Sequence, residues 1–516
     1  MLKLLPTSAR GNVVPLAWLT AVLFAVARGV YIPHIDLAPD EAYYWEWSRH
    51  LDWSYYDQGP LLALFIRFGT WLFGANEFGV RFSAMLCSLG VSGMAIRLCA
   101  VELQRPQQTL WLTLALNTML LFNVGGVLMM HDSVMSLFWM LALAASLRAQ
   151  HEPRWWLAAG LAGACAIMSK YTGVLIFAAI FMAVISQDAL RHHLRSRWFW
   201  LGGIGGLILG WSPIVYWNWH TDWASLGHIF SLAGGKTSRH SWHSLPDFIG
   251  AQLGLITPIL FVLIAFAWWR NRRTQEQQQW FLWWFGMLPF GLFLLLSIYT
   301  KVEGNWPGQA YLAGLLLLAL QIQPRSQVAR WSIISAAFMT ITIFAQAAWP
   351  FLPFTQQQAN LDAAARVDGW RELAQVVTLE RQRFGNPTVI GAYNYQVAAE
   401  LAFYLPDHPQ PLILRNRINN QYRFWNPAQT QIGEDAILVI ETSAQLDSLR
   451  AWFQSIEVVT TVDTRRNGII THTFIVALGT RCVPAANQTT EHPAQLRPSS
   501  TCNMTFTIVS QHICST

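Results

Sequence analysis

The feature that most constrains this chain is a series of apolar segments, each about 20 residues long, separated by short polar connections. A segment of this length can cross the roughly 30 Å hydrocarbon core of a bilayer as one helix. Such segments begin near Val13, Phe78, Gln107, Ser133, Trp155, Thr172, Trp198, Phe248, Trp280, Pro307 and Trp331. We therefore expect a polytopic α-helical membrane protein with about eleven or more spans.

The composition of the chain supports the same class of protein. Its 516 residues are 53% hydrophobic and only 12% charged, against about 25% charged in an ordinary soluble domain. The formal net charge of +6 is spread over short clusters, so it does not form the single basic surface that nucleic-acid binding needs. We therefore expect membrane lipids as partners and no nucleic acid.

The charges in the connections predict how the chain threads the membrane. Alternate connections carry basic residues, namely Lys3 and Arg10, Arg105, Arg148 and Arg154, Arg191 to Arg197, Arg270 to Arg273, and Arg325 and Arg330. The positive-inside rule assigns these connections to the cytoplasm. The others then face outward and hold polar clusters: Asp40-Glu41, His131-Asp132, Ser169-Lys170-Tyr171, Trp217 to Trp223, and Glu303 to Pro307. Because all of these clusters fall on one face, we expect a single extracytoplasmic site at the membrane surface.

Two apolar stretches do not fit this alternation as spans. The stretch from Gly59 to Gly74 contains Arg67 and would invert every later connection if it crossed the bilayer. We expect it to lie in the headgroup boundary as an interfacial helix, and we expect a second in-plane helix over Trp223 to Leu232. The first span contains an Ala25-Val-Ala27 run that also resembles a cleaved secretory signal, but we expect it to be retained as an anchor.

Beyond Trp349-Pro350 the chain takes the composition of a soluble domain. A helical pattern runs from Asp368 to Phe384, and strand-like runs cover Thr388 to Ala392, Ala436 to Glu441, Ile456 to Val462 and Thr471 to Leu478. We therefore divide the chain into a membrane domain (1–350), a small extracytoplasmic α/β domain (351–479) and a tail (480–516). The tail is rich in polar residues without a periodic pattern, so we expect it to be disordered.

The polar clusters also carry a family resemblance. They comprise Asp40-Glu41, Tyr56-Asp-Gln-Gly-Pro60, His131-Asp132, Ser169-Lys-Tyr-Thr-Gly173, Trp217 to Ser225 and Glu303-Gly-Asn-Trp-Pro307. In this order they resemble the bacterial dolichyl-phosphate-mannose-protein mannosyltransferase-like glycosyltransferases, multi-spanning GT-C enzymes related to the aminoarabinose transferase of lipid A modification. The likeness extends from about residue 30 to 320, with a weaker likeness over Trp370 to Trp425.

The resemblance implies a fold and an activity. It implies a GT-C-like bundle in a bacterial inner membrane, with the site and the C-terminal domain on the periplasmic side. It also implies an enzyme that moves a sugar from a polyprenyl-phosphate donor, of the undecaprenyl-phosphate type, to a lipid, glycan or protein acceptor.

The resemblance gives Asp40 the role of catalytic carboxylate. Transfer needs a nucleophilic acceptor hydroxyl while an oxocarbenium-like centre forms at the sugar, and Asp40 suits the general base. For Glu41 two interpretations stay open: a second catalytic group that orients the acceptor or holds a metal, or a surface charge on the following helix. The aminoarabinose branch has a Lys, and the broader family often a His, where this chain has Gln58. No cationic phosphate contact is therefore carried over to that position.

Cations for the departing phosphate must come from other positions. Lys170, with Tyr171 beside it, lies at the outer end of a span, and one charge about 4 Å from a phosphate contributes roughly 4 kcal/mol at an effective dielectric of about 20. The alternative is a snorkelling lysine that anchors the helix end. Arg81, near the start of the second span, is a second candidate, for substrate phosphate or for lipid headgroups. Asp57 and Gln58 are further expected substrate contacts.

The start of a later span and a later connection supply the remaining candidates. His131 and Asp132 can complete a divalent-metal site with Asp40 or Asp57, because hard cations favour carboxylates and imidazole is a common ligand. The alternative is an N-terminal cap, with Asp132 or Ser133 satisfying free amides, and metal dependence stays open. In the later connection, Glu303 and Asn305 suit hydrogen bonds to sugar hydroxyls, and Trp306 can stack on a sugar or anchor the membrane interface.

Two other classes of protein compete with a transferase. A transporter or flippase of lipid-linked sugars is also polytopic, but transporters usually place charged or broken-helix sites near the bilayer midplane in two similar halves. The sequence has neither pattern. A receptor without catalytic activity would not need the clusters around Asp40, Lys170 and Glu303.

Overall fold

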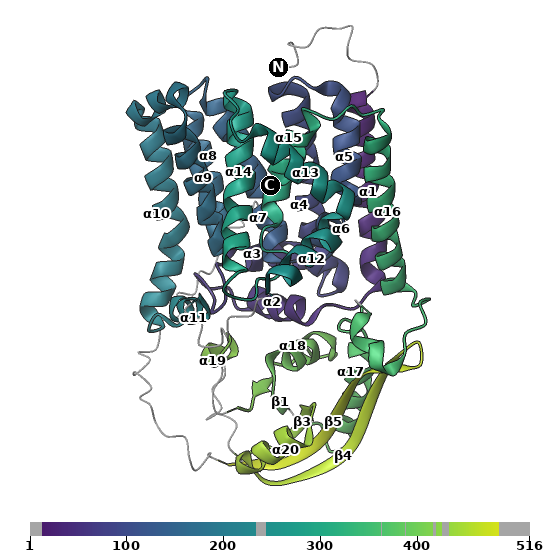
Figure 1. Ribbon diagram of the computed structural model, residues 1–516. Coiled ribbons are helices and arrows are strands. Elements are labelled where there is room, and N and C mark those ends of the chain that lie inside the picture. The colour runs from purple at the N-terminus through teal and green to yellow at the C-terminus, as the bar shows by residue number, and fades with distance from the viewer. Residues whose placement is uncertain are drawn as a thin grey trace, which may run out of the picture.

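The computed structural model describes residues 13–233, 244–362, 364–387, 389–415, 419–425 and 433–483. Its long helices form one bundle, and a smaller domain with a β-sheet lies against one end of that bundle (Figure 1). The predicted class, an α-helical membrane protein with a small C-terminal sheet domain, is confirmed.

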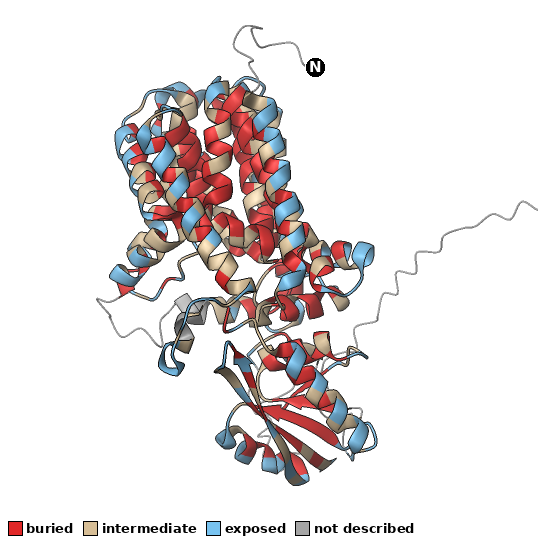
Figure 2. Ribbon diagram, turned by 90° about the vertical axis from the view of Figure 1, so that its right-hand side faces the viewer, coloured by how far each residue is buried: buried red, intermediate tan, exposed pale blue. Residues whose placement is uncertain are grey.

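Six helices among the described residues are long and apolar enough to cross a membrane. They are α1 (Val13–Tyr31), α4 (Glu77–Arg97), α7 (His131–Ala149), α10 (Arg197–His220), α14 (Gln277–Leu296) and α16 (Gln327–Ala348). Each lies where the sequence predicts a span. Their inner faces are buried and their outer faces exposed (Figure 2), and the exposed residues of α1, α10 and α16 are largely apolar, as expected of helices surrounded by lipid.

Three further apolar segments are bent instead of straight. The helix pairs are α5 (Thr109–Thr118) with α6 (Leu120–Val127), bent by 69°, α9 (Leu175–Ser186) with η5 (Asp188–Arg195), bent by 116°, and α12 (Ser244–Ile256) with α13 (Pro258–Asn271), bent by 107°. The last break has a local cause, because Pro258 disfavours the helical conformation at Thr257, which has a φ of 73°. With each pair taken as one span the described residues hold up to nine, so the predicted number of about eleven stays a prediction.

Short helices fill the bundle between the long ones. They are α3 (Leu61–Phe73), α8 (Trp155–Ser169) and α15 (Gly308–Ala319). A Cβ at Gly160 of α8 would collide with the carbonyl oxygen of Gly202 of α10, and a Cβ at Gly206 would collide with that of Gly160. Small residues therefore allow these two helices to cross in close contact, as in other membrane bundles.

Helices also lie across the end of the bundle that faces the sheet domain. These are α2 (Pro39–Arg49) and α11 (Ala224–Ala233) (Figure 1). A helix is present at both predicted interfacial stretches, as α3 for 59–74 and as α11 for 223–232. Their position relative to a membrane surface stays a prediction.

The C-terminal domain is built on a five-stranded sheet with the order β2-β1-β3-β5-β4. Its strands are β1 (Val389–Ala392), β2 (Leu412–Ile413), β3 (Ala436–Ile440), β4 (Phe453–Arg466) and β5 (Ile469–Cys482). Its helices include α17 (Trp370–Arg383), α18 (Tyr395–Tyr404), α19 (Tyr422–Trp425) and α20 (Ser443–Leu449). The strand-like runs and the helix at 368–384 are present, but β5 continues to Cys482, past the predicted domain end at 479. Residues 484–516 of the predicted tail lie outside the described residues.

The C-terminal domain packs firmly on α2. One buried apolar cluster includes Ala42 and Trp47 of α2 together with Ile390 of β1 and Phe403 of α18. The Trp45 ring meets Phe403 edge-on at 5.0 Å. The first turn of α2, which carries Asp40 and Glu41, is therefore enclosed between the bundle and α18.

Candidate active site

Asp40 lies in the first turn of α2, and the C-terminal domain supplies its hydrogen-bond donors. Pro39 begins this helix, where a missing N–H costs nothing. The Tyr395 hydroxyl donates to Asp40 Oδ1 at 3.2 Å, and the Gln396 side chain also hydrogen-bonds the carboxylate. Burial raises the pKa of Asp40 above its usual value, while these bonds and the charge of Arg366 lower it. The result is a half-buried carboxylate whose proton affinity suits a general base.

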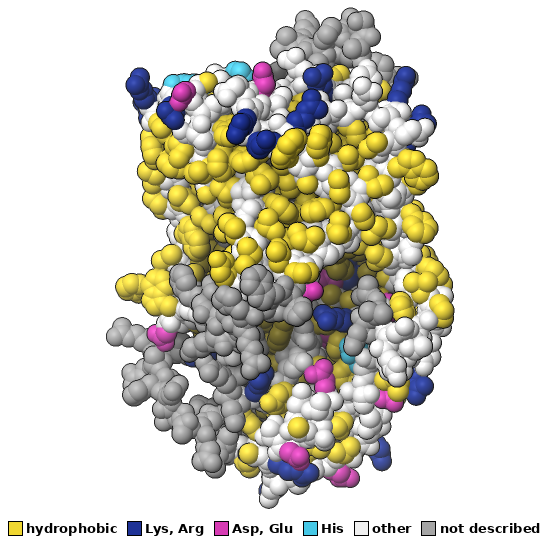
Figure 3. Space-filling view, viewed as in Figure 1, with side chains coloured by type: hydrophobic (Ala, Val, Ile, Leu, Met, Phe, Trp, Pro, Cys, Tyr) yellow, Lys and Arg dark blue, Asp and Glu magenta, His cyan; other side chains and the backbone are white. Residues whose placement is uncertain are grey.

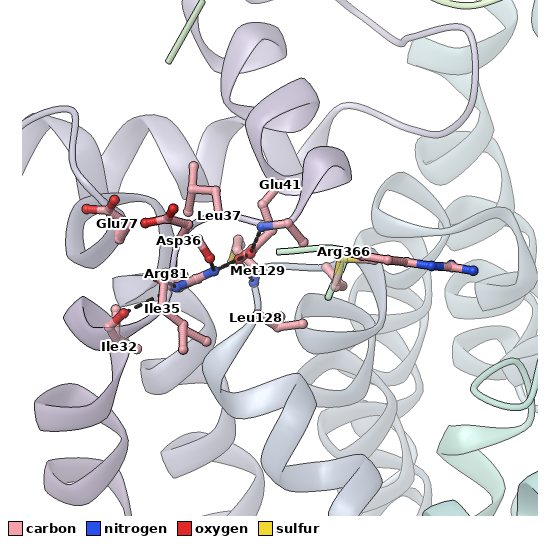
Figure 4. Close-up of polar contacts among 12 residues, drawn as sticks. Ile32, Ile35, Asp36, Leu37, Glu41, Glu77, Arg81, Leu128, Met129 and Arg366 are labelled. Carbon is pink, nitrogen blue, oxygen red and sulfur yellow. Dashed lines mark hydrogen bonds and ion pairs between the residues drawn. The ribbon is translucent and has the colours of Figure 1, made fainter. Parts of the chain in front are cut away.

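Glu41, the next residue, is locked in a buried ion pair. Both its carboxylate oxygens accept from Arg81, at 2.9 and 2.6 Å, and they also accept from the backbone amides of Met129 (2.8 Å) and Ala38 (3.0 Å). The other Arg81 N–H groups donate to the carbonyls of Ile32, Ile35 and Asp36. Figure 4 shows the carboxylate and the guanidinium facing one another, with Arg366 pointing away from the pair.

The two side chains of this pair are both fully buried. Their geometry favours a structural role for Glu41, because both of its oxygens are already occupied. Arg81 likewise has no free donor for a substrate phosphate, so the catalytic role expected for Glu41 and the phosphate role expected for Arg81 lack geometric support.

A second carboxylate, Asp57, lies near Asp40. It accepts a hydrogen bond from the Tyr43 hydroxyl at 2.9 Å, and burial raises its pKa to about 6. Burial is the main reason that the pKa of Tyr44 lies well above its usual value, and the nearby charges of Asp40, Asp57 and Asp132 raise it further. The Tyr44 hydroxyl therefore stays protonated and lies within electrostatic range of all three carboxylates.

The polar clusters of three separate connections meet at Asp132. Lys170 donates to both oxygens of Asp132, at 2.9 and 3.0 Å. The side-chain amides of Asn305 (2.8 Å) and Gln309 (3.2 Å) donate to the same carboxylate. The sequence predicted that His131-Asp132, Lys170-Tyr171 and Glu303–Pro307 share a face, and the structure joins them through hydrogen bonds.

His131 is joined to the end of α8 by hydrogen bonds to Ser169. Its Nδ1–H donates to the Ser169 carbonyl at 2.8 Å, and the Ser169 hydroxyl returns a bond to the His131 carbonyl at 2.9 Å. Of the two residues predicted to cap the start of α7, Ser133 does so, because its hydroxyl accepts a hydrogen bond from the Met130 amide. Within the described ranges no three or more His, Cys, Asp or Glu residues form a group that could hold a metal ion. The set Asp40, His131 and Asp132 thus does not fit a metal centre.

Gln58 and Tyr171 connect the first loop to the Lys170 region. The Gln58 side-chain oxygen accepts from the backbone amide of Tyr171 at 3.1 Å. The Tyr171 hydroxyl bonds Ser225 of α11 at 2.8 Å, and its ring stacks on Trp211. These contacts position the end of α8, and with it Lys170.

Two expected sugar contacts lie apart from this arrangement. Glu303 pairs with Lys301 at 3.0 Å, and both side chains are mostly exposed. The Trp306 ring packs on Phe293 at 5.7 Å. Of the expected residues in this connection, only Asn305 joins the cluster at Asp132.

An apolar cavity opens beside that cluster. Its volume is ≈ 80 Å³, and its wall combines Asp132, Asn305 and Gln309 with apolar side chains of α4, α6 and α15. The space-filling view shows an apolar band around the bundle and, below it, a hollow toward the sheet domain where charged side chains meet (Figure 3). The wall of this cavity therefore places charged and amide groups next to an apolar surface.

Sequence reasoning missed the part of the site that comes from the C-terminal domain. Tyr395, Gln396 and Arg366 are separated from Asp40 by more than three hundred residues, and no local pattern marks them. Gln309 was missed because it lies inside an apolar helix. For Tyr395 and Gln396 a signal was present in the weaker family likeness over Trp370 to Trp425, which does not extend to Arg366.

The fold itself defines a class of protein. ArnT from Cupriavidus metallidurans, in the apo state, has a similar structure, with a TM-score of 0.63 over 91% of this chain and 98% of that chain at 17% sequence identity. The crystal structure of the same protein bound to undecaprenyl phosphate gives a TM-score of 0.62 over 89% and 97% of the two chains, at 16% identity. This chain has an ArnT-like fold, which fits the predicted GT-C-like architecture.

A family model matches part of the chain. Residues 57–217 match the family model described as dolichyl-phosphate-mannose-protein mannosyltransferase. Over this stretch, which is less than half of the chain, the resemblance predicted from the motifs is confirmed.

Curated relatives carry glycosyltransferase names. The lipid A galacturonosyltransferase RgtD of Rhizobium johnstonii is 26% identical over 286 residues, 55% of this chain and 60% of that protein. The undecaprenyl phosphate-alpha-4-amino-4-deoxy-L-arabinose arabinosyl transferase of Erwinia tasmaniensis is 33% identical over 195 residues, 32% of this chain and 34% of that protein. The match thus spans less than two thirds of either relative.

Proposed function

We propose that this chain is a glycosyltransferase that moves a sugar from a polyprenyl-phosphate donor, of the undecaprenyl-phosphate type, to an acceptor. Asp40 carries the proposal, because burial raises its pKa and donors from a second domain hold its carboxylate. The match of residues 57–217 to a mannosyltransferase family model supports the same activity. The names of the relatives support lipid A or a similar glycolipid as the acceptor, among the lipid, glycan and protein acceptors that the chemistry allows.

Asp40 acts as the general base in this proposal. It takes the proton of an acceptor hydroxyl, whose oxygen attacks the anomeric carbon of the sugar as the bond to the phosphate oxygen breaks. The pair of electrons leaves with the polyprenyl phosphate. Tyr395 and Gln396 orient the carboxylate, and burial keeps its proton affinity high enough to accept the proton.

Lys170 stabilises the departing phosphate. Its ammonium group has three N–H donors, and the bonds to Asp132 fix its position at the wall of the cluster. Arg366 provides a second positive charge near Asp40, and it forms no ion pair with any residue that the structure describes. These two cations replace the contact that Gln58 cannot supply.

The orientation across the membrane belongs to the same proposal. Lys and Arg side chains gather at the end of the bundle opposite the sheet domain (Figure 3), which by the positive-inside rule supports a cytoplasmic location for that end. Asp40 and the sheet domain then lie on the periplasmic side of a bacterial inner membrane.

A second candidate function, transport of a lipid-linked sugar, is favoured by the bent helix pairs, since transporters build their sites from broken helices. Mass spectrometry of lipid A, envelope glycans and secreted proteins, from cells with and without the chain, separates the two. Loss of one sugar from a single fraction, restored by the wild-type chain but not by Asp40→Asn, is the expected result. Restoration by Asp40→Asn would support transport and contradict the transferase.

A further inference from the structure

A polar crevice lies at one edge of the sheet in the C-terminal domain. Strands β2, β1 and β3 run parallel, so their carboxyl ends meet at the same edge. In the sheet β2 lies beside one edge of β1 and β3 beside the other. Because the connections after β1 and β2 lead to opposite sides of β1, the boundary between β1 and β3 is a topological switch point. In open α/β sheets, ligands bind in the crevice outside the carboxyl ends at such a point.

The crevice is large and chemically suited to a sugar. Its volume is ≈ 430 Å³, and its wall is formed by the segments that follow the three strands, including Tyr393, Asn394, Gln396, Asn419 and Gln445. Aromatic faces and side-chain amides are the groups that stack on saccharide rings and hydrogen-bond their hydroxyls. The cavity beside Asp132, by contrast, is small and mainly apolar.

Arg415 adds a positive charge to this wall. Its guanidinium lies over the Tyr393 ring at 5.2 Å from the centroid, a cation–π contact that fixes its direction without neutralising it. No carboxylate of the described residues pairs with it. A planar guanidinium held in this way is suited to bind a phosphate or carboxylate through two parallel hydrogen bonds.

Two residues join the crevice to the proposed base. Tyr395 and Gln396 line the crevice, and both hydrogen-bond Asp40. A ligand in the crevice therefore contacts the same side chains that hold the carboxylate. Figure 1 shows α18, which begins with these residues, between the sheet and α2.

We infer that this crevice binds the anionic saccharide headgroup of the acceptor, with Arg415 on its phosphate or carboxylate, and presents a sugar hydroxyl to Asp40. The inference rests on the proposed function and adds the place where the acceptor binds. The donor occupies the membrane side of Asp40 and the acceptor the side of the sheet domain, so the two substrates reach the reaction centre from opposite directions.

Binding to the purified full chain in detergent tests this site without relying on transfer. The probes are glucose 1-phosphate, glucose, inorganic phosphate and a phosphorylated glycolipid in mixed micelles, each measured by saturation-transfer NMR. Arg415→Ala should weaken glucose 1-phosphate binding at least tenfold and leave glucose binding unchanged. Arg450→Ala, which removes an exposed arginine of the same domain that pairs with Asp447 outside the crevice, should bind all probes as wild type does.

The outcomes distinguish a failure of the crevice to bind a ligand from a failure of the transfer reaction. Wild type that binds none of the probes, or Arg415→Ala that binds them all unchanged, overturns the site. Tighter binding of the glycolipid than of glucose 1-phosphate identifies a lipid headgroup as the ligand, whereas equal binding identifies a free sugar phosphate. Asp40→Asn should retain binding, so a failure of transfer with binding intact concerns the proposed function and not the crevice.

Discussion

Removal of Arg81 should destabilise the whole site, because its partner Glu41 is buried and fully hydrogen-bonded. In Arg81→Met the Glu41 carboxylate loses both guanidinium contacts, at 2.6 and 2.9 Å, and has no access to water. Breaking a buried pair by removal of one partner costs about 3–5 kcal/mol. Since the entropy of unfolding is about 2.1 cal/mol/K per residue, 1 kcal/mol corresponds to roughly 1 °C of Tm in a chain of 516 residues. We therefore expect Tm to fall by roughly 3–5 °C.

Matched variants separate a structural from a catalytic role of Glu41. Glu41→Gln keeps the shape but leaves Arg81 unpaired, and it should lower Tm as much as Arg81→Met does. The double variant Glu41→Leu with Arg81→Met buries no charge, and it should recover part of the loss, although the amides of Ala38 and Met129 then lack their acceptor.

The assay is thermal unfolding of the purified protein in one detergent, followed by tryptophan fluorescence, with sugar transfer measured on the same samples below Tm. A structural pair predicts that losses of transfer follow losses of folded protein. If Glu41→Gln keeps the wild-type Tm and yet abolishes transfer, the structural role is refuted and the catalytic interpretation of Glu41 stands.

Three further predictions concern the base, the cation and the packing of the bundle. Tyr395→Phe removes a hydrogen bond that lowers the pKa of Asp40. Because the base works only when deprotonated, the pH below which the transfer rate falls should move to a higher value. An unchanged pH dependence of the rate would contradict the assignment. Lys170→Met should lower transfer on the order of 100-fold with a smaller effect for Lys170→Arg, and equal activity of the two variants would exclude a role for the positive charge. Gly160→Ala should destabilise the bundle by about 1–3 kcal/mol, because the added Cβ meets the Gly202 backbone. The control Gly203→Ala, which has open space around it, should unfold like wild type in the same thermal assay.

Much of the membrane domain could be predicted because bilayer physics imposes a local pattern. A span must be long and apolar, so α1, α4, α7, α10, α14 and α16 were readable from residue type alone. Proline marks the bend at Thr257-Pro258 locally, but the apolar run around it predicts one continuous span. Helix α18 was not predicted, because residues 397–403 are all buried and so show no amphipathic period.

The site was predictable as a set of residues but not as a set of contacts. Charge topology brought Asp132, Lys170 and Asn305 to one face, and the structure places them within hydrogen-bond distance. The adjacent carboxylates Asp40 and Glu41 look alike in sequence, yet one faces Tyr395 and the other Arg81. Successive residues of a helix point in different directions, and only the tertiary fold decides what each of them meets.

The central claim is that Asp40 is the base for sugar transfer, and single-turnover transfer by purified Asp40→Asn tests it most directly. The matched control is Asp447→Asn, which removes the same charge from an exposed pair with Arg450 in the C-terminal domain. With a polyprenyl-phosphate sugar bound at saturation, we expect Asp40→Asn to lose at least about 100-fold in rate at unchanged donor affinity, and Asp447→Asn to match wild type. Transfer by Asp40→Asn at the wild-type rate would contradict the account.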